Sequence, residues 1–532
     1  IMILYVWLAA AIAAVYLYCR QVYSRFKGFG VKYNEPVPLL GNMGPIVLRR
    51  KHLVEVLSEL YTEYPEERFV VRFEFMKPVL VIRDLELLKR IAVKDYEHFL
   101  DHGLSVRKNI DPLFSRTLFA LQGQEWKDMR STLSPAFTSS KIRNMVPFIV
   151  EVGDQMMASL KKQLKDSGKT YIDIDSKDIA TRYANDVIAS CAFGLHVDSH
   201  SEPNNEFYKM GYIASNFTFW QILKFLLHSG FPQIMKSLGI KLFSESTRAF
   251  FKKLVTDTMT DREERNILRP DMIHLLMEAK KGRLTYDEKT GKDADAGFAT
   301  VEESDVGKKF INRAWTDTDL TAQALIFFLA GFETVSTAMT FILYELALNS
   351  DVQDKLVQEI KEHEKKNGGK FDYNSIQTMT YLDMVVSEGL RRWPPAIATD
   401  RLCIKDYNLG PANEKSTRDY IIKAGENLNI PITAFHYDPQ YFPDPLKFNP
   451  ERFSEENKHK IQPNTYMPFG VGPRNCIGSR FALCEIKVMI YQLLLHMELA
   501  PSEKTMIPAQ LTKDTFNLRL KGGHSLRMKL RN

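Results

Sequence analysis

The chain has 532 residues, a length that excludes peptides, disulfide-stapled miniproteins and fibrous repeats. Hydrophobic residues make up 45% and charged residues 26%, so a large core can be buried and little room remains for long disorder. The net charge of +6 is too small over this length to predict nucleic-acid binding, and five scattered cysteines fit reduced thiols better than a disulfide framework.

The first nineteen residues, Ile1 to Cys19, are uncharged and almost wholly apolar. As a helix they would reach about 28 Å, the thickness of a bilayer core, which predicts a single transmembrane anchor over 1–19. Several basic residues follow before the first acid, Glu35, so the positive-inside rule places the rest of the chain in the cytosol. A cleaved signal peptide is the alternative, but the segment lacks a basic start. A basic, proline-containing linker is expected over 20–45, with a hinge-like part from Asn34 to Asn42, and the main domain over 46–532.

Beyond the linker most segments have helical periods, and one short region favours a sheet. Arg68 to Phe75 alternates in hydropathy and meets Val79 to Ile82 across Lys77-Pro78, which predicts a β-hairpin. The polar stretch from about Lys281 to Arg313 has glycines and dense charge, and predicts an exposed loop. The expected fold class is mainly α with a smaller β region.

A long core helix is expected next. Thr316-Asp-Thr-Asp319 has the pattern of a capping box, and the run Leu320 to Leu348 is apolar on most faces. A second membrane span is the alternative, although polar residues interrupt the run. In the middle, Ala330-Gly-Phe-Glu-Thr334 places a glycine and an acid where both are unfavourable. A ligand against the helix would explain them: Gly331 would permit its approach, the Thr334 hydroxyl would bond to the Ala330 carbonyl, and Glu333 would relay protons. A polar patch in a core helix is the plainer alternative.

The segment Phe469-Gly-Val-Gly-Pro-Arg-Asn-Cys-Ile-Gly478 stands directly before a helical pattern from Ser479 to Leu494. Cys476 therefore lies near a helix N-terminus, where amide groups and the helix dipole favour the metal-binding thiolate. Gly472 and Gly478 would let the backbone close on a flat cofactor. A single cysteine is usually an inert core residue, but five fixed residue types in ten positions arise by chance on the order of once in ten thousand.

These ten residues resemble, at every position, the cysteine signature Phe-x-x-Gly-x-Arg-x-Cys-x-Gly of the cytochrome P-450 superfamily of haem-thiolate enzymes. Ala330 to Thr334 resembles the oxygen-activating turn of the family's long central helix. Glu388-x-x-Arg391 and the later Arg452 resemble its structural ion-pair network. The segments 129–138 and 297–304 resemble insect microsomal members of family nine, which is related to the mammalian drug-metabolising family three.

The resemblance implies the cytochrome P-450 fold, with a long central helix over haem b and a haem-thiolate catalytic domain over 46–532. Cys476 would be the axial ligand of the haem iron, and Thr334 and Glu333 the catalytic pair that controls proton delivery. The other residues implied to bind the cofactor are Trp126, Arg130, Arg401, Arg474, Ala330, Gly331, Phe469 and Gly478.

The chain has no convincing Gly-x-Gly-x-x-Gly between a strand and a helix, so it is not expected to bind NADPH itself. An NADPH-dependent flavoprotein reductase is the expected electron donor, with cytochrome b5 as a further donor. A basic face that would attract such a partner is expected from Lys127, Arg130, Arg480 and Lys487. The expected location is the endoplasmic reticulum membrane, with one span and a cytosolic catalytic domain.

The substrate is the least defined feature. By resemblance, the loop 104–121 and the aromatic segment 217–231 wall the pocket, although the latter could equally lie in the bilayer surface or the core. The other implied pocket residues are Phe327, Phe328, Ile397 and Phe516. An apolar lining favours lipophilic molecules, so the expected function is an unspecific monooxygenase of xenobiotics such as plant toxins or insecticides. Endogenous steroids or fatty acids are alternative substrates. A reductase-independent isomerase or dehydratase and a non-catalytic haem sensor are alternatives of other classes.

Overall fold

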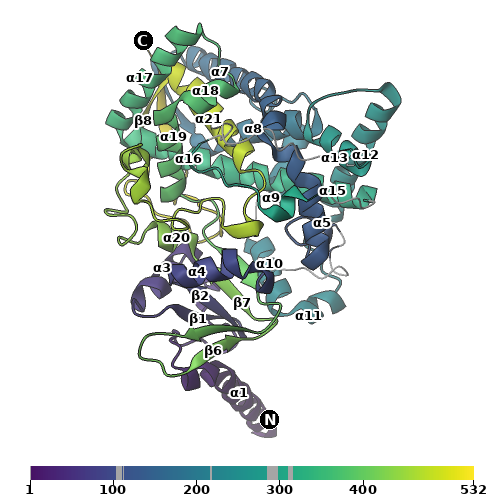
Figure 1. Cartoon of the computed structure of the whole chain (residues 1–532), viewed down its shortest axis with the longest axis vertical. Helices are drawn as coiled ribbons and strands as arrows, with labels where there is room; N and C mark the ends of the chain where they lie inside the picture. The colour runs from purple at the N-terminus through teal and green to yellow at the C-terminus, as the bar shows by residue number, and fades with distance from the viewer. Residues whose placement is uncertain are drawn as a thin grey trace.

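The computed structural model describes residues 2–103, 111, 113–215, 219–283, 297–309 and 315–531. A large helical body lies above a smaller region that contains most of the strands, and helix α1 (Met2–Tyr23) projects from the strand-rich end (Figure 1). Helices hold 56% of the residues, which confirms the predicted mainly α class with a smaller β region.

The helices that follow α1 are short near the N-terminus and longer in the body. Their bounds are α2 (Gly44–Val47), α3 (Leu53–Glu63), α4 (Leu85–Lys89), α5 (Gly123–Leu133), α6 (Ser139–Arg143), α7 (Val146–Ser167), α8 (Ser176–Ile188), α9 (Glu206–Ser215), α10 (Phe219–Gly230), α11 (Pro232–Ser237), α12 (Glu245–Arg265), α13 (Met272–Lys280), α14 (Asp305–Lys308), α15 (Asp317–Ala330), α16 (Ser336–Leu348), α17 (Ser350–Asn367), α18 (Tyr373–Thr378), α19 (Thr380–Arg392), α20 (Ile432–His436) and α21 (Ser479–His496).

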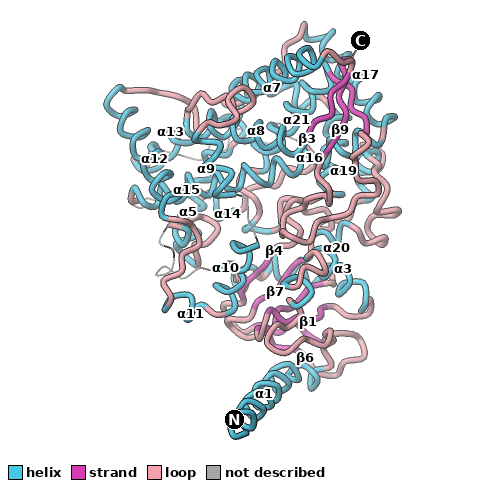
Figure 2. Tube along the Cα trace, turned by 180° about the vertical axis from the view of Figure 1, so that it is seen from behind, coloured by secondary structure: helices cyan, strands magenta, loops and turns pink. Residues whose placement is uncertain are grey.

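The described strands form three small sheets, seen in magenta in Figure 2. The strand bounds are β1 (Phe69–Glu74), β2 (Lys77–Ile82), β3 (Tyr171–Asp175), β4 (Thr399–Leu402), β5 (Tyr407–Pro411), β6 (Asp419–Ile422), β7 (Asn427–Ile430), β8 (Met497–Pro501) and β9 (Ser525–Leu530). The first sheet has the order β1-β2-β7-β4, the second β3-β9-β8 and the third β5-β6. The antiparallel β1–β2 pair, with Phe73 opposite Pro78, is the predicted hairpin.

The long apolar helix lies in the core, as predicted, but it is not α-helical over its whole length. Thr316 and Asp319 form the expected capping box at the start of α15. A π-helical turn, η7 (Gly331–Val335), separates α15 from α16. The combined span Asp317–Leu348 is apolar enough to cross a membrane, yet 67% of its most apolar window is buried inside the protein, which favours the core helix over a second span. A π-turn inside an α-helix frequently marks a functional site.

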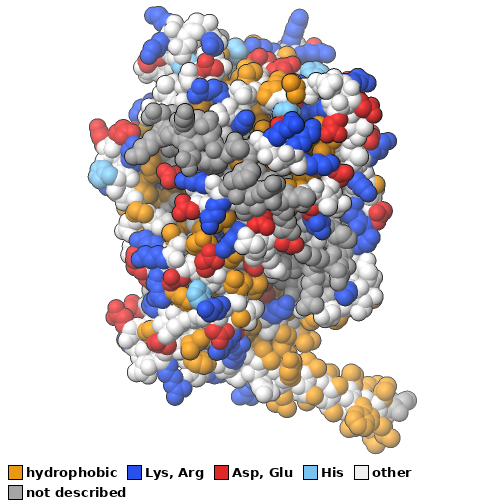
Figure 3. Space-filling model, turned by 45° about the vertical axis from the view of Figure 1, so that its right-hand side comes forward, with side chains coloured by type: hydrophobic (Ala, Val, Ile, Leu, Met, Phe, Trp, Pro, Cys, Tyr) orange, Lys and Arg blue, Asp and Glu red, His pale blue; other side chains and the backbone are white. Residues whose placement is uncertain are grey.

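The N-terminal helix extends further than the predicted anchor. The helical run Met2–Phe29, formed by α1 and the 3₁₀-helix η1 (Ser24–Phe29), has a mean hydropathy of 2.1 with 6% of its most apolar window buried. It is the apolar helix that projects from the body in Figure 3. Its last turns pack on the body, because Cys19, Tyr23 and Phe26 are buried in the same cluster as β1, where Tyr23 and Phe73 meet edge-on at 4.7 Å. The beginning of the expected linker over 20–45 is therefore helical and lies against the body.

The predicted exposed loop 281–313 is also only partly correct. Residues 284–296 and 310–314 lie outside the described residues. Within 297–309, however, Ala299 and Val306 are buried and α14 packs beside α5. The charge of Glu303 hid this packing, because its partner Arg130 is distant in the sequence.

Candidate active site

The cysteine segment forms a tight loop before α21. The amide of Cys476 donates to the carbonyl of Phe469 at 2.8 Å, which closes the loop three residues before Ser479. Cys476 is exposed although Val471, Pro473 and Asn475 around it are buried, so its side chain faces an opening within the fold. The other four cysteines are buried. Cys476 is therefore the thiol that a ligand can reach.

The environment of Cys476 has opposing effects on its ionisation. Although its side chain faces an opening, the thiol lies deep inside the fold, and this burial raises its pKa, while the backbone amide of Gly478 and the charge of Arg130 lower it. Burial raises the pKa of Cys403 to about 11 and that of Cys484 to about 12. Their protonated state agrees with the expectation that they are ordinary thiols.

One face of the central helix is accessible inside the otherwise buried body. Ile326 and Phe327 are half-buried, and Ala330 and Thr334 are exposed. The Thr334 hydroxyl donates to the Ala330 carbonyl at 2.5 Å, as the sequence predicted. Phe137 connects this face to the cysteine loop: its ring packs edge-on against Phe327 at 5.2 Å, and a Cβ added at Gly478 would lie 3.7 Å from it.

Three sequence-based assignments need correction. A Cβ at Gly331 would point at Ile188 of α8, 2.9 Å away, so this glycine permits close helix packing rather than ligand approach. A Cβ at Gly472 would lie 1.8 Å from the Ala92 carbonyl, so Gly472 allows a backbone crossing and does not close on a cofactor. Phe328 is fully buried among aromatic rings, including Phe251 at 5.0 Å, and does not line a pocket.

Four of the residues implied to bind the cofactor converge on the cysteine loop: Trp126, Arg130, Arg401 and Arg474. The Arg474 guanidinium lies 4.0 Å from the ring centroid of Trp126 and donates to the Leu121 carbonyl at 2.8 Å. Arg401, buried, donates to the Val471 carbonyl at 2.9 Å. Burial lowers the pKa of Arg474 to about 9 and that of Arg401 to about 10, with partial compensation by nearby carboxylates.

Arg130 has a partner that the sequence reading missed. Its guanidinium forms a bidentate pair with Glu303, with N–O distances of 3.1 and 2.7 Å, and donates to the carbonyl and side chain of Asn475, both at 2.8 Å. Arg130 thus fixes the residue next to Cys476. Glu303 lies in the segment 297–304 that carried part of the family resemblance, which was its only sequence signal.

Haem can be tested against this set of residues. Its iron requires a reachable soft donor, which Cys476 supplies, and its flat face requires small side chains, which Ala330 and Thr334 supply. Its anionic edge requires buried cations nearby, and three arginines surround the cysteine loop. The residues fit haem, with Cys476 as the ligand to iron. Bound haem would supply the activation of dioxygen.

The residues of the expected ion-pair network lie together around the buried Glu388. Arg391 donates to both carboxylate oxygens of Glu388, at 2.7 and 2.9 Å, and neither side chain is exposed. Arg452 approaches Glu388 at 3.4 Å. Arg391 also donates to the His436 carbonyl at 2.8 Å, and His436 accepts from the amide of Met467 at 2.9 Å, just before the cysteine loop. The network therefore supports that loop structurally.

Glu333 is buried between two cations that no local pattern indicated. Lys177 of α8 lies 3.3 Å from its carboxylate, and Arg519 lies 3.0 Å from it. The unfavourable burial inferred from the sequence is thus compensated by residues far away in the chain.

The predicted basic face is wrong for two of its four residues. Arg130 is buried against Glu303, and Lys487 is buried and pairs with Asp383 at 2.8 Å. Lys127 is partly exposed and pairs with Glu97 at 2.8 Å, and Arg480 is half-buried. Two of the four residues therefore cannot present charge to a partner.

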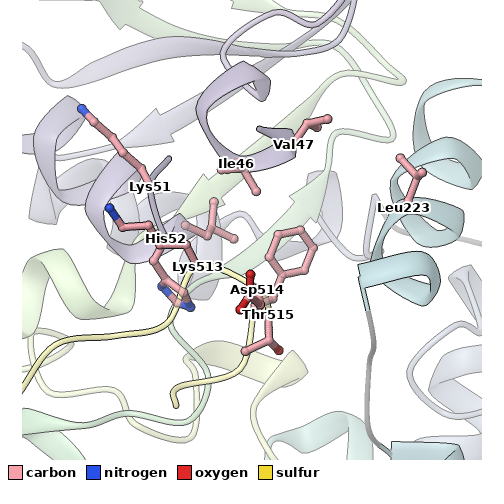
Figure 4. Close-up of a pocket in the computed structure, with 10 residues that line it drawn as sticks. Ile46, Val47, Lys51, His52, Leu223, Lys513, Asp514 and Thr515 are labelled. Carbon is pink, nitrogen blue, oxygen red and sulfur yellow. The ribbon is translucent and has the colours of Figure 1, made fainter. Parts of the chain in front are cut away.

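The remaining pocket residues lie in different clusters. Ile397 packs with Trp393 and Leu518, whereas Phe516 packs with Ile46 and Phe75. Phe516 also lines a small open cavity of about 20 Å³, whose other lining residues include Ile46, Leu223 and Asp514 (Figure 4). Residues 104–110, 112, 217 and 218 of the predicted pocket walls lie outside the described residues. In the remainder, Leu118 and Leu121 are buried and Trp220 is 71% exposed.

The fold is mainly helical, and a reachable cysteine with buried arginines around it stands before a helix. An acid–threonine pair lies in a π-turn of the central helix. Together these features define a haem-thiolate protein. The family model described as "Cytochrome P450" matches residues 31–525. The chain therefore belongs to the cytochrome P450 family, whose members are oxidoreductases that bind haem b and typically receive electrons from NADPH through a reductase.

The relatives agree with the predicted subfamily. The chain is 45% identical to "Cytochrome P450 9e2" of Blattella germanica, over 92% of this chain and 90% of the relative. It is 42% identical to "Probable cytochrome P450 9f2" of Drosophila melanogaster, over 98% of both chains. A family-six relative, "Cytochrome P450 6k1" of Blattella germanica, is 36% identical over 95% of this chain and 93% of its own length. The resemblance to insect family nine is confirmed.

Proposed function

We propose that this protein is a membrane-anchored monooxygenase of lipophilic xenobiotics such as plant toxins or insecticides. The overall reaction is RH + O2 + NADPH + H⁺ → ROH + H2O + NADP⁺, with the two electrons delivered by a flavoprotein reductase. The observation that carries the proposal is the accessibility of Cys476 alone among the cysteines, together with the accessible apolar face of α15.

Each group at the site has a role in this proposal. Cys476 would hold the haem iron. The anionic edge of haem would be surrounded by Arg130, Arg401, Arg474 and Trp126. The Thr334 hydroxyl, which donates to the Ala330 carbonyl, accepts a hydrogen bond beside the ligand, and Glu333 supplies protons to this side of the helix. Phe327 and Ala330 give the ligand face its apolar character, which favours molecules that partition into lipid.

The anchor supports a location at the endoplasmic reticulum membrane. The helix Met2–Phe29 is long and apolar enough to span it, and basic residues follow the apolar run. A cytosolic orientation would make the catalytic body available to the reductase. Protease added outside sealed microsomes should then digest the body, and protection of the body would contradict this orientation.

Turnover of a compound panel by membrane-bound protein, with and without reductase and NADPH, tests the function. The panel contains insecticides, plant toxins, steroids and fatty acids. We expect hydroxylated xenobiotics only with reductase and NADPH, and none from Cys476→Ser. Turnover confined to steroids or fatty acids would refute the xenobiotic assignment. Product formed without a reductase would refute the monooxygenase reaction, and haem binding without any turnover would favour a sensor.

A further inference from the structure

The segment 297–309, which we call the strap, lies on the side of the body that carries the cysteine loop. At its start the amide of Phe298 donates to the side chain of Asp383 in α19 at 2.9 Å. At its end α14 packs beside α5, and the Ser131 hydroxyl of α5 donates to the carbonyl of Val306. The strap therefore joins α19 to α5.

The middle of the strap supports the residue next to Cys476 in two ways. The side-chain amide of Asn475 donates to the carbonyl of Glu302 at 3.0 Å. The carboxylate of Glu303 holds the Arg130 guanidinium at two points, and Arg130 in turn donates to the side-chain oxygen and to the carbonyl of Asn475. Both ends of the Asn475 side chain thus depend on the strap, one directly and one through Arg130.

This support lies in the interior of the protein. The side chains of Arg130 and Glu303 are only 4% and 8% exposed. Ser134 of α5 also donates to Glu303, at 3.0 Å, and a Cβ added at Gly307 would collide with the Glu303 side chain. Hydrogen bonds in such a low-dielectric environment are stronger than the same bonds in water. The position of Glu303 is therefore well defined, and so is that of the arginine it holds.

The strap also covers the two buried cations of the predicted basic face. It covers Arg130 through Glu303, and at its start it rests on the ion pair between Asp383 and Lys487. A Cβ added at Gly297 would collide with Asp383 and lie 2.8 Å from Lys487 Nζ, and the φ of Gly297 is +144°. A side chain at Gly297 would therefore be both strained and without room.

We propose that the strap holds the cysteine loop in place, with Glu303 as a positioning residue that acts on Cys476 through Arg130 and Asn475. The inference rests on the proposed function in one respect, the assignment of Cys476 as the haem ligand. Groups that orient a metal ligand from the second shell determine how firmly that ligand is held. Neither the cysteine signature nor the ion-pair network contains a residue of the strap, so the strap is a further support of the loop.

The test compares Glu303→Gln with the conservative Glu303→Asp and with Glu302→Gln as the matched control. The side chain of Glu302 is exposed and its carbonyl alone bonds to Asn475, so Glu302→Gln should match the wild type. Each holoprotein is kept in urea below its unfolding transition by circular dichroism, and the conversion of its thiolate carbon monoxide spectrum to the thiol form is timed. We expect Glu303→Gln to convert about ten-fold faster than the wild type, with Glu303→Asp at an intermediate rate. Gly297→Val, which disturbs the far end of the strap, should also convert faster.

Hydrogen exchange of the same proteins separates this inference from the proposed function. The amides of 469–478 should exchange faster in Glu303→Gln than in the wild type, while those of β5 and β6 should be unchanged. Wild-type behaviour of Glu303→Gln in either assay would overturn the inference, as would equally faster exchange in β5 and β6, which would show a general loss of stability. If the wild type gave no thiolate spectrum, the proposed function would fail while the exchange result still decided the role of the strap. If Glu303→Gln failed to fold, Glu303→Asp and Gly297→Val would supply the same comparison, and wild-type rates in both would overturn the inference.

Discussion

Replacing Arg391 with methionine should destabilise the protein far more than the same change at Arg452, although both arginines approach Glu388. Arg391 makes two bonds to Glu388 and one each to the carbonyls of His436 and Pro445, at 2.7–2.9 Å, and its side chain has no exposure. Its removal leaves Glu388 buried with one amide donor, from Asn449, and with Arg452 at 3.4 Å.

The expected magnitudes follow from these contacts. Removal of one member of a buried ion pair costs about 3–5 kcal/mol, a large share of the ~5–15 kcal/mol that stabilises a typical native protein. Arg452 is a partly exposed member with a longer contact, so Arg452→Met should cost about 1 kcal/mol. Arg391→Lys keeps the charge but loses the planar two-point geometry and should lie between them.

The assay is the temperature at which each purified holoprotein loses its thiolate carbon monoxide spectrum, measured at one heating rate. Arg391→Met should lose the spectrum at a much lower temperature, or fail to retain haem, because Arg391 supports Met467 and the cysteine loop through His436. Equal transition temperatures for Arg391→Met and Arg452→Met would refute the reasoning, as would a wild-type value for Arg391→Met.

Further variants and one pH series test other parts of the protein. Cys476→Ser should abolish the thiolate carbon monoxide spectrum, whereas Cys403→Ser and Cys484→Ser should keep it; the opposite pattern would show that the ligand is misassigned. Thr334→Ala should keep the spectrum yet release more peroxide and less product per NADPH, and an unchanged ratio at an equal rate would remove its assigned role. Deletion of residues 2–18, which spares the buried Cys19, should shift much of the protein to the soluble fraction with haem intact, and unchanged sedimentation with membranes would refute the anchor. Burial opposes ionisation of Asp319, but hydrogen bonds from Arg116 and Thr316 lower its pKa below the usual value. The ionised Asp319 therefore stabilises the N-terminus of α15 at neutral pH, and this stabilisation is lost as pH falls below about 4. In melts between pH 6 and 3, Asp319→Asn should therefore show a smaller acid-dependent loss than the wild type.

The sequence predicted best what is encoded locally. The hairpin, the capping box, the Thr334–Ala330 bond and the position of Cys476 before a helix all depend on residues that lie close together in the chain, at most 13 positions apart across the hairpin. Phe328 was placed wrongly because α15 is apolar on all sides, so its pattern does not say which of two adjacent phenylalanines faces a ligand.

The sequence could not predict contacts between residues that lie far apart in the chain. Lys177 and Arg519 are 156 and 186 residues from Glu333 along the chain, and neither has a neighbouring motif. The packing of Tyr23 could not be predicted for the same reason, because its partner Phe73 lies 50 residues further along the chain, in β1. The ion-pair network was predicted only through the family resemblance.

The π-turn Gly331–Val335 rotates the two halves of the central helix, α15 and α16, relative to each other. A π-turn contains one residue more than an α-helical turn, and one residue corresponds to about 100° of rotation in an α-helix. Loss of that residue would turn Phe327 and Ala330 away from the side that Thr334 faces, while Glu333 and its cations could keep their packing against α8. Under the proposed function, the half that meets the substrate is thus rotated relative to the half that handles protons. The side chains of Asp317–Ala330, and with them the range of compounds accepted, can then vary in evolution without disturbing the proton-handling residues one turn away.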